Sequence, residues 1–307
     1  MNNTNTLTEP TPEVVAADSC ERPDAIARCE QIAGCAGQIG RAAVESMVVC
    51  LNDPDPMVRW EASLALAESA HNLQRPQDLS QIMAMGSSEA ITPGELLAVM
   101  REGLASPEPS QRASFAESLG RWPHQTAVAL LEQALGDDTA MVRATAARGL
   151  GQLGALESAS ALIEALGDKS LWVRRAAADA LGAIGDPSAA EPLAAMGKQG
   201  PILTRTAALA ALGHLPGKVA RETLTECLSD QDGEVRWQAA RSLQAIGTLS
   251  SMPVLERLLA DDFTLFDESV RDVALGAIKA IGQREQGAWH ALRLVVIRLV
   301  GRLRRRP

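Results

Sequence analysis

Five arginines that recur every 31 residues form the clearest chemical pattern in this sequence. They are Arg112, Arg143, Arg174, Arg205 and Arg236, together called the arginine ladder. A row of guanidinium groups can bind a phosphate chain or carboxylates, because the planar fork of arginine donates paired hydrogen bonds. A leucine follows each ladder arginine by seven residues, and a glycine follows four of these leucines. Self-similarity at a fixed period of this length indicates a repeat architecture.

Aspartates at a fixed offset favour a structural role for the ladder. An aspartate stands six residues before the arginine in four repeats: Asp53, Asp137, Asp168 and Asp230. Such an aspartate can cap the next helix while its remaining lone pairs accept from the arginine. Ser106 and Gln199 replace it before Arg112 and Arg205. We therefore expect Arg112 and Arg205 to be the freer arginines and the better candidates for contacting a ligand.

Each period has the pattern of two helices joined by tight turns. Both halves of the unit 155–185 carry an apolar stripe at helical spacing, and glycine with aspartate ends each half. One helix pair cannot bury both its faces, so the pairs must stack. The sequence predicts an all-α fold, an α-solenoid of about seven repeats led by Arg59, the ladder arginines and Arg271.

The departures from the period suggest the domain boundaries. The repeats predict a solenoid over residues 23–283, with a polar, turn-rich insertion near 71–93 and four extra residues near 261–266. Residues 1–22 have the composition of a disordered tail. Residues 284–307 carry seven arginines against one glutamate and an apolar stripe, which predicts a basic amphipathic helix.

Two roles are open for this C-terminal helix. It can cover the exposed end of the stack, which we favour. It can also meet an anionic membrane surface or an acidic protein. The candidate contact residues of the basic tail are Arg302, Arg304, Arg305 and Arg306.

The phrase V-R-x-x-A-A-x-A-L-G-x-I-G-D-P at 173–187 resembles the HEAT-like repeat named after phycobilisome lyases. Weaker copies stand at 142–154 and 235–247. The resemblance implies an α-solenoid. Proteins similar to this repeat include bilin lyase subunits, factors of phycobilisome degradation and bacterial scaffolds without enzymatic activity. Deoxyhypusine hydroxylase, another HEAT-like enzyme, depends on His-Glu dipeptides for its iron, and none of the four histidines here precedes glutamate.

The resemblance also indicates where a partner would bind. In HEAT-like stacks the second helices line the concave face, and the positions one and five after each ladder arginine should point towards it. Tryptophans and arginines there are typical of interface hot spots. The candidate partner-binding residues are Trp60, Trp237, Arg148, Arg175 and Arg241, with Trp172 at the rim. The alternative is that each tryptophan packs against the adjacent repeat.

No catalytic or metal site is evident in the sequence. The spacings of Cys20, Cys29, Cys35 and Cys50 match no common zinc or iron–sulfur pattern, and no nucleophile–base pair or phosphate loop is visible. We expect the helical cysteines, Cys227 included, to be buried; a thiol that holds a bilin or a metal transiently is the alternative. The net charge of −9 argues against a general nucleic-acid binder. No secretory signal is evident, so a cytoplasmic protein is expected.

Two functions remain from the sequence. The first is a non-catalytic scaffold or assembly factor that grips another protein on its concave face and needs no cofactor. The second is a bilin lyase subunit or bilin-binding chaperone acting on phycobiliproteins, whose arginines would bind the propionates of a phycobilin. The second is the enzymatic class to which the chain would belong if it were an enzyme.

Overall fold

The computed structural model describes residues 23–73 and 91–284, and the chain divides into two units between Pro93 and Gly94. The predicted tail 1–22, residues 74–90 of the predicted insertion, and residues 285–307 of the predicted C-terminal helix lie outside the described residues. The basic tail residues lie there too: Arg302, Arg304, Arg305 and Arg306. No helix within the described ranges is long and apolar enough to cross a lipid bilayer.

The described residues of the first unit form three helices, α1 (Pro23–Cys35), α2 (Arg41–Cys50) and α3 (Pro56–Asn72). The residues at the start of α3 are ones that favour the beginning of a helix. Asp55 accepts a hydrogen bond from the Met57 amide at 2.8 Å, and Pro56 occupies the first helical position, where its missing N–H costs nothing. Both α1 and α2 pack against α3.

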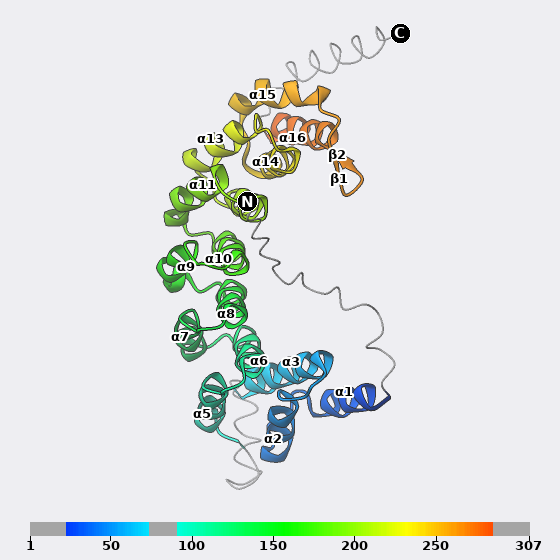
Figure 1. Ribbon diagram of the computed structural model, residues 1–307, viewed down its shortest axis with the longest axis vertical. Coiled ribbons are helices and arrows are strands. Elements are labelled where there is room, and N and C mark those ends of the chain that lie inside the picture. Colours follow the sequence, from blue (N-terminus) through cyan, green and yellow to red (C-terminus); the bar gives the residue numbers. More distant parts are fainter. Residues whose placement is uncertain (1–22, 74–90, 285–307) are drawn as a thin grey trace, which may run out of the picture. The chain divides into compact units, whose positions relative to one another are not determined.

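Within the part of the second unit that the structure describes, the helices form a stack of six pairs (Figure 1). The first helices are α5 (Pro93–Leu104), α7 (Gln125–Ala134), α9 (Ala159–Ala165), α11 (Ala190–Lys198), α13 (Lys218–Cys227) and α15 (Met252–Arg257). The second helices are α6 (Pro109–Leu119), α8 (Ala140–Leu153), α10 (Leu171–Ile184), α12 (Ile202–Leu212), α14 (Gly233–Ile246) and α16 (Val270–Arg284). Short 3₁₀ turns precede α9, α11 and α15: η2 (Leu156–Ser158), η3 (Pro187–Ala189) and η4 (Leu249–Ser251); a further one, η5 (Leu258–Ala260), follows α15. In Figure 1 the second helices of this unit line the inner side of a shallow arc.

The leucine–glycine pattern of the sequence places the core and sets the helix spacing. The leucine seven residues after each ladder arginine is fully buried: Leu119, Leu150, Leu181, Leu212 and Leu243. A glycine follows four of these leucines and lies where successive second helices are in close contact. A Cβ on Gly151 would stand 2.7 Å from the Cα of Ala180, which is closer than real Cβ atoms come. Glycine is therefore required there for close packing.

The predicted all-α solenoid is confirmed, with α3 and six second helices of the second unit matching the seven predicted repeats. The irregularity near 261–266 takes a form that the sequence did not suggest. It is a short antiparallel hairpin of β1 (Thr264–Leu265) and β2 (Glu268–Ser269), with Thr264 paired to Ser269 and Leu265 to Glu268.

Candidate functional site

Four of the five ladder arginines link their own repeat to the turn of the following repeat. Arg143 shows the arrangement: its Nη1 donates to the backbone carbonyls of Asp137 and Asp138 at 2.8 and 3.0 Å. Its Nε and Nη2 bond the carboxylate of Asp168, 25 residues further on, at 2.8 and 2.9 Å. The Asp168 carboxylate also accepts from the Ser170 amide at 2.7 Å. The aspartate six residues before an arginine thus contributes its carbonyl, and its carboxylate serves the preceding repeat.

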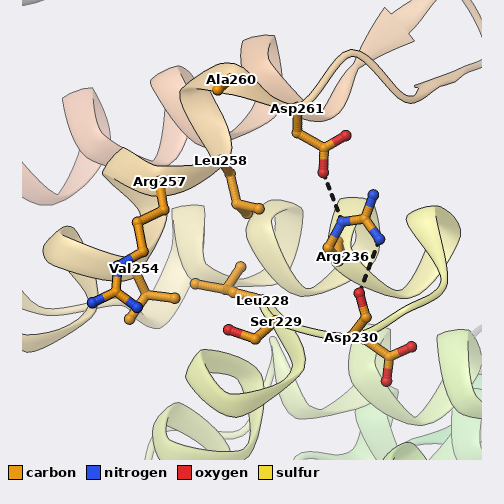
Figure 2. Close-up of a pocket in the computed structure, with 9 residues that line it drawn as sticks. All are labelled: Leu228, Ser229, Asp230, Arg236, Val254, Arg257, Leu258, Ala260 and Asp261. Carbon is orange, nitrogen blue, oxygen red and sulfur yellow. Dashed lines mark hydrogen bonds and ion pairs between the residues drawn. The ribbon is translucent and has the colours of Figure 1, made fainter.

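The same offset of 25 residues recurs along the chain. The other pairs are Arg28–Asp53, Arg112–Asp137, Arg205–Asp230 and Arg236–Asp261. Figure 2 shows one of them, with Arg236 between the backbone carbonyl of Asp230 and the carboxylate of Asp261. The predicted structural role of the ladder therefore holds, but its carboxylates come from the next repeat.

The expectation that Arg112 and Arg205 are freer is wrong. Arg112 is buried and bonds both Asp137 and Asp138. Arg205 bonds Asp230 and donates from its Nε to the carbonyl of Gly197 at 3.1 Å. The period of the sequence fixes the offsets between repeats, but it does not say which of two adjacent turns supplies the carboxylate. Neither arginine offers an unpaired guanidinium to a partner.

Arg28 and Arg174 depart from the pairing that the sequence predicted. Arg28 lies 31 residues before Arg59, a spacing that would have revealed it, and it extends the pairing into α1. Arg174 is the exception within the ladder, because Gln199 stands 25 residues after it. Its Nη1 donates to the carbonyls of Asp168 and Lys169 at 2.6 and 3.3 Å, and it has no carboxylate partner among the described residues.

The protonation behaviour of the ladder agrees with a structural role. The hydrogen bonds from Arg112 and Arg143 lower the pKa values of Asp137 and Asp168, more than desolvation raises them. The same hydrogen bonds raise the pKa values of the two arginines. Both members of each pair are therefore charged at neutral pH, and each charge is already satisfied within the protein.

A groove between α8 and α10 brings together several of the predicted concave-face residues. It measures about 460 Å³ and is lined by Ala144, Arg148, Gly151 and Gln152 of α8 and by Trp172, Arg175, Ala176, Asp179, Ala180 and Ala183 of α10. Four of these residues stand one or five positions after a ladder arginine: Ala144, Arg148, Arg175 and Asp179. Small residues form its apolar part, and two guanidiniums, one carboxylate and an indole border it.

The charged residues of the groove are only loosely paired. Arg148 is 54% exposed and lies 3.3 Å from Glu117, the equivalent residue of the preceding repeat. Arg175 lies 3.7 Å from Asp179 on the same helix, and both are about half exposed. Desolvation raises the pKa of Asp179, and Arg175 and Arg148 offset part of that rise. Exposed ion pairs of this kind contribute little to stability, so these guanidiniums can exchange partners at small cost.

The tryptophans divide into exposed and covered ones. Trp172, in the first turn of α10, is 54% exposed at the groove. Trp237 is only 7% exposed, so the expectation that it presents an open surface is wrong and the alternative of packing against the fold holds. The guanidinium of Arg241 lies 4.9 Å from the centre of its ring and 3.7 Å from Glu268. Trp60 is 50% exposed in the first unit.

The cavity of Figure 2 follows from the repeat geometry. It measures about 390 Å³ around the Arg236–Asp261 pair. A second cavity of about 210 Å³ is lined by residues that include Leu104, Leu130 and Asp137. Their counterparts in the first cavity, Leu228, Val254 and Asp261, all follow by 124 residues, four periods of 31. A space that recurs at equivalent positions is a property of the stack, and the groove between α8 and α10 is the better candidate site.

Three of the described cysteines do not have the properties of reactive thiols. Burial raises the pKa values of Cys29, Cys50 and Cys227, so these groups stay protonated at neutral pH. The prediction of a buried residue is confirmed for Cys227, whereas Cys29, Cys35 and Cys50 are half-buried. Within the ranges that the structure covers, no three His, Cys, Asp or Glu side chains form a group that could hold a metal ion.

Known proteins include a repeat family and solved structures that are similar to this chain. A model of HEAT repeats matches residues 96–170, 137–213 and 198–279. The X-ray structure of YibA of Escherichia coli is similar, with 19% identity and a TM-score of 0.56 over 90% of this chain and 96% of that chain. The complex of CpcE and CpcF of phycocyanin lyase from Nostoc has 21% identity and a TM-score of 0.43 over 78% of this chain and 87% of that chain. No curated protein matches the chain significantly. Since the repeat model covers more than half of the sequence, the chain belongs to the HEAT repeat family.

Proposed function

We propose that this protein is a scaffold that binds a segment of another protein in the groove between α8 and α10. The observation that carries the proposal is the meeting of Trp172 with Arg148 and Arg175 over a surface of alanine and glycine. Tryptophan and arginine dominate the binding energy of many interfaces, because both combine a large apolar surface with hydrogen-bond donors.

The chemistry of the groove indicates which segment fits. An apolar side chain of the partner would cover the indole of Trp172 and the alanines of α10. Carboxylates beside it would replace Glu117 and Asp179 as the acceptors of the two arginines, whose present contacts are 3.3 and 3.7 Å long. We therefore expect an apolar segment with acidic neighbours.

The test is a quantitative capture experiment with the full chain in lysate of its native cells. The double variant Trp172→Ala with Arg175→Ala should lose the main captured protein, with affinity for the purified partner falling at least about tenfold. Arg257→Ala is the matched control, because this arginine is exposed on α15, in the row of first helices. Equal capture by the double variant and the control would exclude the groove as the binding site.

Bilin binding is the second candidate, because the same groove carries two guanidiniums that suit the two propionates of a tetrapyrrole. Recombinant protein mixed with phycocyanobilin should then show a shifted visible absorbance band, and Arg175→Ala should weaken the shift. Trp172→Ala should weaken the shift as well; Trp237, the other tryptophan beside a candidate arginine, is buried and is not tested. An unchanged spectrum with all bilins tested would exclude this function.

A further inference from the structure

The hairpin between η5 and α16 holds an aromatic side chain in the solvent on a strained turn. Phe266 and Asp267 are the two central residues of this turn, with φ values of 49° and 65°. Such turns favour asparagine and glycine, because positive φ is costly for a bulky side chain. Phe266 is nonetheless 86% exposed, more than any other large apolar residue described. Neither the conformation nor the exposure of Phe266 favours folding, which points to a role in binding.

The base of the hairpin is held firmly on the solenoid. The Phe263 amide donates to Asp261 at 3.0 Å, and the Val270 amide donates to the Phe263 carbonyl at 2.8 Å. The ring of Phe263 packs over Gly233 at the start of α14, where an added Cβ would lie 2.3 Å from the ring. These contacts fix the strand ends, so Phe266 is presented by a rigid support. Rigid presentation lowers the entropic cost of binding.

The charges around the tip indicate the chemistry of the binding partner. Asp267 is exposed and has no ion-pair partner among the described residues. The ion pair of Glu268 with Arg241 is long, at 3.7 Å. The other nearby carboxylates are engaged, Asp262 with Arg271 and Asp272 with Ser269. The tip is therefore an apolar anchor flanked by negative charge. The same charges disfavour a surface of anionic lipid.

We propose that Phe266 inserts into an apolar pocket of a partner protein, and that basic side chains at the edge of this pocket bind Asp267 and Glu268. The inference rests on the proposed scaffold function and adds a second contact that is separate from the groove. The Glu268–Arg241 contact places the hairpin beside the second helices of this unit, as Figure 1 also shows. The groove lies between two of these second helices, α8 and α10. A protein bound along the second helices would meet both contacts.

Site-specific photo-crosslinking in native cells tests the inference. A photoreactive phenylalanine analogue is placed in the full chain at position 266, at 172 in the groove, or at 249 as an exposed control in the 3₁₀ turn before α15. The expected result is a discrete protein adduct at 266 whose crosslinked peptide is apolar and borders Lys or Arg. An adduct no stronger than that at 249, an acidic crosslinked peptide, a lipid adduct or a second copy of this chain would overturn it.

The crosslinks also separate this inference from the scaffold proposal. An adduct at 172 without one at 266 leaves the groove proposal standing and overturns the role of Phe266. Absence of adducts at both positions counts against both.

Phe266→Gly gives an independent measurement with the partner identified by the crosslink. Glycine adopts positive φ readily, so the variant should unfold at the same or a higher temperature than the wild type. Its affinity for the partner should fall at least about tenfold, as expected for an aromatic hot spot. Asp267→Lys should weaken binding and reduce its salt dependence. An unchanged affinity of Phe266→Gly would overturn the inference.

Discussion

Two arginines on α8, five residues apart, show how this repeat separates stability from recognition. Arg143 has only 6% of its side chain exposed and makes a two-pronged ion pair with Asp168 of the next repeat. Arg148 is 54% exposed and has one contact of 3.3 Å with Glu117. Both side chains carry the same charge, so their surroundings set the difference. The ladder position joins neighbouring turns, whereas the position beside it faces a groove and can bind another molecule.

The largest expected effect comes from breaking the buried pair. Arg143→Ala should lower the free energy of unfolding by about 3 kcal/mol, because it leaves the Asp168 carboxylate largely buried without its main partner. Arg148→Ala, the matched control on the same helix, should cost about 0.5 kcal/mol or less. Urea unfolding followed by circular dichroism measures both values. Similar losses of unfolding free energy in the two variants would show that the burial of the Arg143–Asp168 pair does not decide its contribution to stability.

Acid should reduce the difference between wild type and Arg143→Ala. The pKa of Asp168 is lowered in the folded protein, chiefly by the hydrogen bond from Arg143 that the variant removes. A lowered folded-state pKa contributes stability that is present above the unfolded value of about 3.9 and is lost as pH falls through the folded value. The unfolding free energies of the two proteins should therefore converge below about pH 4. A constant difference between pH 7 and pH 3 would show that packing, not charge, accounts for the effect of Arg143→Ala.

The smallest effect concerns the incomplete position of the ladder. Gln199→Asp places a carboxylate 25 residues after Arg174, as in the other pairs, and should stabilise the protein by about 0.5–1 kcal/mol. Gln199→Asn is the control, because it has the same shape without the charge. Thermal unfolding of the three proteins in low and high salt measures the gain, which salt should reduce. If Asp and Asn variants are equally stable, the turn around Gly200, with its φ of 102°, does not allow the pair.

The sequence predicted the architecture well because the repeat depends on local chemistry. Helical spacing, glycine at helix ends and a constant period are all visible in one dimension, and they predicted the second helices from α3 to α16. The positions one and five after Arg143 and Arg174 also met in one groove, since a regular stack places equivalent residues side by side. Arg28 lies one period before Arg59, so the same spacing could have identified it.

The pairing of the charges was harder to predict. Where an aspartate stands six residues before an arginine, the spacing is equally compatible with a bond inside one turn and with a bond to the preceding repeat. Bonds inside one turn would leave Arg112 and Arg205 without a carboxylate. The structure shows bonds between repeats, so both arginines are paired. The exposure of the tryptophans was equally undetermined, because Trp60 and Trp237 occupy equivalent positions and only Trp237 is covered.

The sequence by itself determined the period, the helix pairs and the small residues at the close contacts, because each depends on neighbours along the chain or on an exact repeat. Only the tertiary structure decided which carboxylate meets which guanidinium, which indole faces solvent, and that Phe266 stands on a strained hairpin. These outcomes depend on distances between residues about 25 or more positions apart and on local breaks in the repeat, where periodicity carries no information. The ladder thus proved to be the internal support of the stack, and the candidate binding residues lie beside it.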